Sequence, residues 1–308
     1  MNKMTTMKKD FDNFLETTIK LYFKEKSTLN SSIIYSLNAP GKRIRPLLVL
    51  AFSEMFKGKK EAALCSALAI EMIHTYSLIH DDLPSMDNDD FRRGLPTNHK
   101  VYGEAQAILA GDSLLNLAPE YLIKELQKTN FDPSLTLELV SKMLEASGHL
   151  GMIKGQSLDI EFESKEINFL DSKNLAIELK NIHHLKTGAI ITWSALAGLY
   201  SSEDKDLIRK FSCPVESIGQ RIGLLFQVVD DIIDVTSTLD QIGKTPGKDL
   251  AAGKLTYTSL YRLDGAKEMA KELFLDIKAS LEELQNQGFE TNLVEEILTT
   301  ICQKISNS

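Results

Sequence analysis

Apolar residues recur along most of the chain at intervals of three and four, the spacing of one face of an α-helix. The clearest case is the segment 215–235, whose apolar face consists of Ile218, Ile222, Leu225, Val229 and Ile232. The segment 61–82 is apolar on nearly every side, so we expect a helix at the centre of the fold, surrounded by other helices. Strand-like alternation is hard to find. The pattern predicts an all-α protein.

Proline and glycine residues indicate where the helices begin and end. Pro46 suits the first position of a helix after GKRIR, and Gly58, Gly111 and Gly148 are expected to separate later helices. No linker rich in proline, serine or glycine divides the chain, and the long polar, glycine-bearing insertion is at 237–256. We therefore expect one large domain, although 308 residues would ordinarily suggest about two.

The composition is that of an ordinary globular protein, with 43% hydrophobic and 25% charged residues and a net charge of −8. The lack of a lysine- and arginine-rich run argues against nucleic-acid binding. No segment approaches the roughly 18 apolar residues of a membrane span, so we expect no stable membrane insertion. Cys65, Cys213 and Cys302 are scattered, which argues against disulfides and structural zinc and favours the reducing cytoplasm.

The stretch LIHDDLPSMDNDDFRRG, residues 78–94, places five aspartates within ten positions behind an apolar helix. Crowded carboxylates repel one another, so a folded protein keeps them together only where water, bases or a metal ion compensates. Asp81 and Asp87 are six residues apart and would lie on different faces of a regular helix. Because Pro84 disfavours helical geometry just before it, we expect the chain to bulge and bring Asp87 back toward Asp81.

A second aspartate cluster ends the segment 215–235. Asp230 and Asp234 are one turn apart and emerge on the same face, whereas Asp231 points elsewhere. Either cluster alone could be a solvated helix end. Together they indicate two carboxylate walls of one cleft, where Mg²⁺ would be bound by carboxylates and by phosphate oxygens of a substrate. A calcium loop starting at Asp87 fails, because phenylalanine stands where an oxygen ligand is needed.

Basic residues supply matching phosphate sites, although ordinary solvent exposure is the alternative for any one of them. Lys42, Arg43 and Arg45 precede Pro46 at a helix N-terminus, whose N–H groups and dipole favour anions. A second set follows the first aspartate cluster or lies in the polar insertion: Arg92, Arg93, Lys244, Lys248 and Lys254.

Seven short motifs follow one another between about residues 41 and 258: GKRIRP, DDLPSMDNDDFRRG, LAGD, GMIKGQSLD, KTG, FQVVDDIID and GKTPGKD with a later lysine. In this order and spacing they resemble the trans-prenyl diphosphate synthases, particularly the bacterial farnesyl diphosphate synthases. The resemblance implies the isoprenoid synthase fold, a single domain over 1–308 with about ten or more helices around a central cavity, and a homodimer. It also implies Mg²⁺-dependent condensation of isopentenyl diphosphate with dimethylallyl and then geranyl diphosphate, through an allylic cation.

The resemblance also assigns roles to individual residues. Three Mg²⁺ ions, or Mn²⁺ in their place, are expected on Asp81, Asp82, Asp87, Asp230, Asp231 and Asp234. The residues expected to support the allylic diphosphate are Arg92, Lys186, Thr187, Gln227, Lys244 and Lys254. Isopentenyl diphosphate is expected to bind Lys42, Arg45, His74 and Arg93. Gln156 and Asp159 would lie behind the first metal cluster. Those expected to carry catalysis are Asp81, Asp82, Asp87, Arg92, Lys186, Asp230 and Lys244.

The residues that precede the first aspartates bear on product length. Tyr76 and Ser77 lie about 6 to 8 Å deeper along the same helix than Asp81, where a growing prenyl tail has to pass. By resemblance, an aromatic residue here is typical of farnesyl-type enzymes, whereas geranylgeranyl-type relatives carry a smaller or more flexible one. We therefore expect (2E,6E)-farnesyl diphosphate, with geranylgeranyl diphosphate as the alternative product.

Two further functions are compatible with parts of this pattern. A terpene cyclase shares the helical fold and an aspartate-rich motif, but it would not need the GKRIRP phosphate site. A non-catalytic partner subunit could lose its metal ligands, yet all six aspartates are present.

Overall fold

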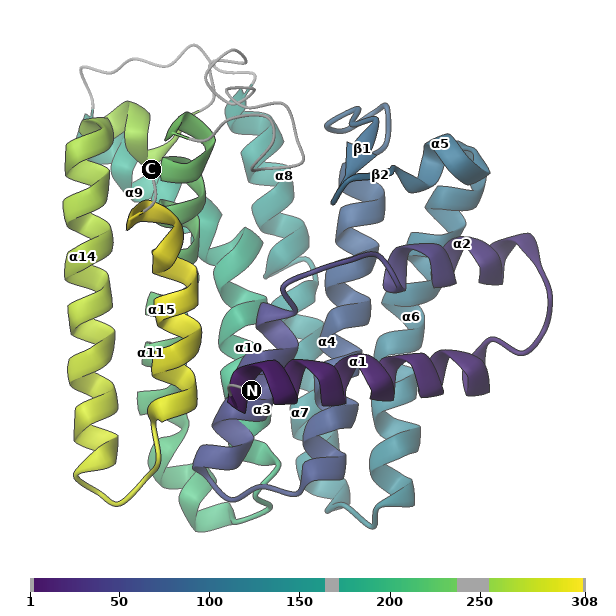
Figure 1. Cartoon of the computed structure of the whole chain (residues 1–308), viewed down its shortest axis with the longest axis horizontal. Helices are drawn as coiled ribbons and strands as arrows, with labels where there is room; N and C mark the ends of the chain where they lie inside the picture. The colour runs from purple at the N-terminus through teal and green to yellow at the C-terminus, as the bar shows by residue number, and fades with distance from the viewer. Residues whose placement is uncertain (1–2, 164–171, 237–254, 307–308) are drawn as a thin grey trace.

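The computed structural model describes residues 3–163, 172–236 and 255–306, and helices make up most of it (Figure 1). The helices are α1 (Lys3–Tyr22), α2 (Thr28–Leu37), α3 (Ile44–Met55), α4 (Lys60–Asp81), α5 (Asn98–Tyr102), α6 (Glu104–Lys128), α7 (Pro133–Ser147), α8 (Met152–Glu163), α9 (Ser172–His183), the π-helix η2 (His184–Gly188), α10 (Ala189–Tyr200), α11 (Lys205–Thr236), α14 (Tyr257–Gln285) and α15 (Asn292–Ser306). The strands β1 (Phe91–Arg92) and β2 (Leu95–Pro96) form a short antiparallel hairpin. The all-α prediction is confirmed.

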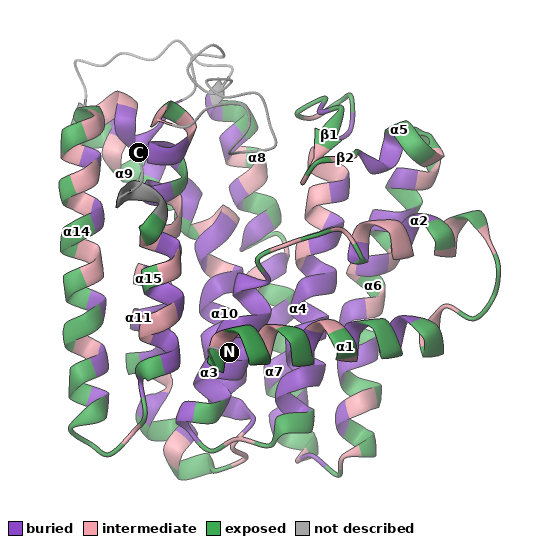
Figure 2. Cartoon of the chain, in the orientation of Figure 1, coloured by how far each residue is buried: buried purple, intermediate pink, exposed green. Residues whose placement is uncertain are grey.

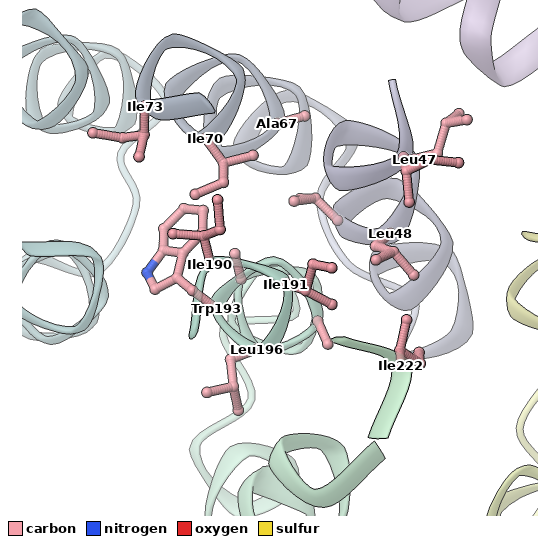
Figure 3. Packing of buried hydrophobic residues seen from close by; sticks show 14 of the residues in the cluster. Leu47, Leu48, Ala67, Ile70, Ile73, Ile190, Ile191, Trp193, Leu196 and Ile222 are labelled. Carbon is pink, nitrogen blue, oxygen red and sulfur yellow. The ribbon is translucent and has the colours of Figure 1, made fainter. Parts of the chain in front are cut away.

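Helix α4 lies at the centre of the bundle, as its apolar sequence predicted. It packs against α3, α6 and α10, and Figure 2 shows α4 and α10 buried on most sides while α1 and α14 keep exposed faces. Ile70 of α4 lies beside Trp193 and Ile190 of α10 (Figure 3). Trp193 is 1% exposed and its indole N–H donates to the carbonyl of Leu139 at 3.0 Å. Burying such side chains contributes about 1.5–3 kcal/mol each, which fixes α4 firmly in place.

Helix α11 extends the amphipathic segment 215–235 at both ends, and it approaches its neighbours very closely. A Cβ atom on Gly219 would lie 2.8 Å from the Cα of Thr192, and one on Gly223 would lie 2.6 Å from the Cα of Gly188. Both glycines face the joint between η2 and α10, so backbone packs directly on backbone there. This contact sets the position of α11 relative to η2.

Two boundary predictions need correction, and one element was missed. Helix α3 begins at Ile44, two residues before Pro46, because Arg43 adopts a left-handed conformation (φ 55°, ψ 35°) at the N-cap position. Gly58 and Gly148 do lie between helices, but Gly111 lies inside α6. There it makes room for an imidazole, since a Cβ atom on Gly111 would lie 2.1 Å from Nε2 of His80. The β1–β2 hairpin was not predicted at all.

The membrane prediction is also corrected in one respect. Among the described residues, α4 is long and apolar enough by composition to span a membrane, contrary to the expectation that no segment would be. However, 78% of the most apolar 18-residue stretch of α4 is buried inside the protein. That burial is typical of a central helix surrounded by others.

The two aspartate-bearing helices end at the same end of the bundle. In Figure 1 the C-terminal ends of α4 and α11 both lie at the top, where the β1–β2 hairpin also lies. The fold therefore brings together motifs that are about 150 residues apart in sequence.

Candidate active site

The chain turns back on itself directly after α4. The backbone N–H of Asp87 donates to the carbonyl of Asp81 at 2.9 Å. The N–H groups of Met86 and Asn88 both donate to the carbonyl of Leu83, at 2.9 and 3.1 Å. The expected return of Asp87 toward Asp81 is confirmed.

Asp81 lies in a place that disfavours its own negative charge. Burial raises the pKa of this carboxyl to about 6, against the opposing effect of Lys186, and the neighbouring carboxylate of Asp87 raises it further. A carboxyl group whose charge is disfavoured in this way gains most from a nearby cation.

Asp82, in contrast, is occupied by Arg92 of the hairpin. Nε of Arg92 donates to Oδ1 of Asp82 at 2.7 Å and Nη2 donates to the same oxygen, while Nη2 also reaches Oδ2 of Asp89 at 3.3 Å. The Asp82 side chain is only 4% exposed. Arg92 thus joins Asp82 to Asp89, a residue to which the sequence analysis gave no role.

The second cluster divides as its helical spacing predicted. Asp230 is exposed and Asp234 is partly buried, one turn apart on α11. Asp231 is buried instead, and its Oδ2 accepts the backbone N–H of Tyr257 at 2.7 Å. Asp231 therefore caps the first residue of α14 and ties α11 to it.

The GKRIRP segment lies next to this second cluster. Lys42 and Asp230 line one small pocket, together with Ile44. Burial lowers the pKa of Arg45 to about 10, and the charges of Glu71 and Asp230 act in the opposite direction. Basic and acidic motifs that are far apart in the sequence thus meet in one place.

His74 lies among the arginines of this part of the site and is itself neutral. Its Nε2 lies 3.3 Å from Nη2 of Arg93, and since an arginine can only donate, Nε2 is the acceptor. Burial holds the pKa of His74 well below its usual value, and the positive charges of Arg45 and Arg93 lower it further.

Replacing His74 by glutamine should weaken the pH dependence of stability. As the pH falls from about 7.5 to about 5.5, the unfolded chain protonates this imidazole while the native protein does not, so the wild type loses stability. Glutamine cannot take up that proton, so the variant should lose less. Thermal unfolding at several pH values measures the difference, with exposed His149→Gln as the control. If the stability of His74→Gln changes with pH in parallel with the wild type, a lowered pKa of His74 in the native protein is disproved.

Lys186 and Thr187 lie on the π-helix η2, an insertion that often marks functional sites. Nζ of Lys186 donates to Oδ2 of Asp159 at 2.6 Å, and Oγ1 of Thr187 donates to Oε1 of Gln227 at 2.7 Å. Gln156 lies partly buried on α8, one turn before Asp159. The structure thus brings four of the predicted residues together in pairs that the sequence did not specify.

Tyr76 and Ser77 lie below Asp81 on α4. The Tyr76 ring is 5% exposed and packs edge-on against His80, with 5.8 Å between ring centroids. Within the part of the chain that the structure describes, its hydroxyl has no hydrogen-bond partner. Ser77 turns its hydroxyl back to the carbonyl of His74 at 3.0 Å. The Tyr76 ring thus offers an apolar surface, whereas the Ser77 hydroxyl is bonded within its own helix.

Lys244, Lys248 and Lys254 fall outside the described residues. Within residues 3–163, 172–236 and 255–306, no three aspartate, glutamate, histidine or cysteine side chains are grouped closely enough to hold a metal ion by themselves. A metal here would need water or phosphate oxygens to complete its shell, which is how Mg²⁺ usually binds.

Comparison with known proteins places the chain in a family. The model of the polyprenyl synthetase family matches residues 26–293. The farnesyl diphosphate synthase of Micrococcus luteus is 41% identical over 287 residues, which cover 92% of this chain and 94% of that protein. The chloroplastic heterodimeric geranylgeranyl pyrophosphate synthase large subunit 1 of Arabidopsis thaliana is 41% identical over 279 residues, covering 89% and 71%.

A solved structure agrees with these relatives. The geranyltransferase of Helicobacter pylori, complexed with magnesium and isoprenyl diphosphate, superposes with a TM-score of 0.77 at 31% identity and covers 97% of each chain. The resemblance that the motifs indicated is confirmed by sequence and by fold. The chain belongs to the polyprenyl synthetase family and is a prenyltransferase of the trans-prenyl diphosphate synthase type.

Proposed function

We propose that this enzyme condenses isopentenyl diphosphate with dimethylallyl diphosphate, and then with geranyl diphosphate, to give (2E,6E)-farnesyl diphosphate. The observation that most supports this reaction is the meeting of acidic and basic motifs at one end of the bundle. Lys186 lowers the pKa of Asp81 there, and Asp230 raises that of Arg45, in each case against the larger effect of burial. Carboxylates next to buried bases suit a metal–diphosphate substrate better than either group alone.

The donor set fits Mg²⁺, which would be held by Asp81, Asp82 and Asp87 on one side and by Asp230, Asp231 and Asp234 on the other. We propose three ions, with Mn²⁺ able to replace them. When bound, Mg²⁺ neutralises negative charge that develops on the departing diphosphate. Asp82 would have to share its carboxylate with Arg92, and Asp231 with the N–H of Tyr257.

The basic residues would divide between the two substrates. Arg92, Lys186, Thr187 and Gln227, with Lys244 and Lys254 from outside the described residues, would hold the allylic diphosphate, where positive charge favours loss of the leaving group in a partly buried site. Lys42, Arg45, His74 and Arg93 would hold isopentenyl diphosphate.

The reaction then needs no nucleophilic side chain. The allylic C–O bond breaks and its electron pair leaves with diphosphate. The isopentenyl double bond supplies the electrons for the new C–C bond, and the carbon beside the resulting cation loses a proton to the released diphosphate. The surrounding apolar residues keep out water, which would otherwise capture the allylic cation.

Direct assay tests this function against its rivals. The purified chain with Mg²⁺, geranyl diphosphate and isopentenyl diphosphate should give a fifteen-carbon alcohol after dephosphorylation and chromatography. A terpene cyclase would release a hydrocarbon without consuming isopentenyl diphosphate, and a non-catalytic subunit would give no product. A twenty-carbon main product would favour the geranylgeranyl alternative, since relatives of both kinds are 41% identical to this chain.

Replacing Tyr76 by alanine should lengthen the product beyond fifteen carbons. The buried ring lies on the same helix as Asp81, about one and a half turns deeper, and its removal would open space for at least one more isoprene unit. Tyr76→Phe is the matched control. Because the hydroxyl has no hydrogen-bond partner among the described residues, phenylalanine should keep the wild-type length. Equal product lengths in the alanine variant and the wild type would show that Tyr76 does not limit the length of the product.

We further propose a single domain over 1–308 that forms a cytoplasmic homodimer. One cluster of buried hydrophobic residues includes members from α1 to α15, which supports a single domain. Ile108 and Leu109 of α6 and Leu137 and Leu144 of α7 are between 44% and 74% exposed, and apolar side chains in such positions suit a subunit interface. Sedimentation equilibrium at micromolar concentration would contradict the dimer if it gave the mass of one chain.

A further inference from the structure

Arg43 stands between two residues of the proposed isopentenyl diphosphate site, Lys42 and Arg45, yet its own side chain turns into the protein. Nη1 donates to Oε1 of Glu71 on α4, Nη2 donates to the carbonyl of Leu37 at 3.0 Å, and Nε donates to Oδ1 of Asp12 on α1 at 3.2 Å. The Arg43 side chain is 5% exposed and that of Glu71 is 1% exposed. All three guanidinium nitrogens are therefore committed to protein acceptors.

The backbone at Arg43 is strained. Its φ of 55° and ψ of 35° lie in the left-handed region, which residues with a Cβ atom rarely adopt. Such a conformation persists only where the surroundings over-determine it. Here the hydrogen bonds come from α1, from the end of α2 and from α4, so three elements hold one residue in this turn.

Glu71 is the buried member of this network, and it also acts on the neighbouring bases. It lies one turn before His74 on α4. Its negative charge is the main influence that opposes the lowered pKa of both Arg45 and Arg93, whose pKa values fall chiefly through burial. The Glu71 carboxylate accepts its hydrogen bond from Arg43. The guanidinium groups of Arg45 and Arg93 are therefore left to bind a diphosphate.

We propose that Arg43 and Glu71 are a positioning pair: their buried ion pair holds the left-handed turn at position 43 and thereby directs Lys42 and Arg45 to isopentenyl diphosphate. Arg43 itself does not touch the substrate. The identity of the substrate rests on the proposed function, but the role of the pair in shaping an anion site does not.

Glycine and alanine at position 43 separate this role from direct binding. Both lack the guanidinium group, but glycine adopts a positive φ without strain and alanine does not. Both are made together with Glu71→Gln, so that no buried carboxylate is left unpaired. We expect the alanine double variant to raise the KM for isopentenyl diphosphate about tenfold or more, and the glycine double variant to raise it several-fold less. The KM for geranyl diphosphate should change by less than about twofold in both.

Equal losses in the two variants would show that Arg43 binds the substrate directly, and an unchanged KM in both would show that the pair positions nothing. Either result overturns the proposal. Asp12→Asn removes the more exposed partner, whose side chain is 37% exposed, and should raise the same KM only about twofold in a fully folded protein.

Calorimetric titration with inorganic diphosphate, without added metal, repeats the comparison without turnover. The wild type should bind most tightly, then the glycine variant, then the alanine variant. If the three proteins bound diphosphate in this order but the wild type made no prenyl product, the proposed function would be refuted. The positioning role of Arg43 and Glu71 would be retained. If the alanine and glycine variants bound diphosphate equally tightly, the positioning role of Arg43 and Glu71 would be refuted, whatever product the wild type made.

Discussion

Replacing Asp81 by asparagine is expected to lower kcat for condensation about a thousandfold or more, which corresponds to about 4 kcal/mol of transition-state stabilisation. Asparagine keeps the shape of the side chain but removes the charge that would hold a metal against the departing diphosphate. The return of the chain to Asp81, through the Asp87 N–H bond at 2.9 Å, uses only backbone atoms and should survive the substitution.

The same variant should be at least as stable as the wild type in the absence of metal. The pKa of Asp81 in the native protein, about 6, is above that of an unfolded chain, so the ionised carboxylate destabilises the native state increasingly as the pH rises from about 4 to about 6. Asparagine removes that penalty at neutral pH. Loss of activity together with unchanged or higher unfolding temperature therefore separates a metal role from misfolding.

Asp90→Asn is the matched control, because it makes the same chemical change nine residues later. Asp90 is exposed and pairs with Lys100 at 2.7 Å, a surface contact that contributes about 0–1 kcal/mol. Its kcat should stay within about twofold of the wild type. Steady-state kinetics with geranyl and isopentenyl diphosphates compares the two variants, and calorimetry of Mg²⁺ with inorganic diphosphate tests metal binding without turnover. More than a tenth of wild-type kcat in Asp81→Asn would contradict its role.

The helices could be predicted from the sequence because burial of apolar surface dominates their formation. The segment 61–82 is apolar on nearly all sides, a pattern typical of a helix surrounded by other helices, so α4 was placed correctly in the centre. The start of α3 was not predictable in the same way. It depends on the left-handed turn at Arg43, which is held by Glu71 across 28 residues of sequence.

The acidic loop was predictable for a local reason, since Pro84 forces the break that lets Asp87 return to Asp81. The partners of the charged residues were not. Arg92 had several aspartates within reach and pairs with Asp82, while Lys186 pairs with Asp159, 27 residues away. One signal was available: Glu71 is a carboxylate in an otherwise apolar helix, and a buried carboxylate requires a base.

The π-helix η2 was invisible for a further reason. Hydrophobic periodicity averages over several turns, so one extra residue in the turn that carries Lys186 leaves no clear mark in the pattern. Gly155 is one hint in the sequence, and its meaning emerges from the packing. A Cβ atom on Gly155 would lie 2.2 Å from the backbone nitrogen of Lys186 and 2.6 Å from its Cα.

Gly155→Ala is therefore expected to lower kcat about a hundredfold, because a methyl group at this position must push the backbone of Lys186 away from α8. Displacement of a positioned group by about 1 Å can cost that much in rate. The KM for isopentenyl diphosphate should change little, because Arg45 and His74 lie on other helices. Gly265→Ala in α14 is the control: its one close contact is Cβ of Tyr261 at 3.0 Å, which requires a shift of only a few tenths of an ångström, so activity should be retained.

Asp159→Asn provides a second way to displace the same lysine, since Asp159 accepts the Nζ bond at 2.6 Å. Substitutions that act through one shared group are not additive, whereas independent ones are. If Gly155→Ala and Asp159→Asn both act through Lys186, the double variant should have nearly the kcat of the worse single variant. A double variant whose losses multiply would show that the close approach of α8 to η2 affects the reaction by a route that does not pass through Lys186.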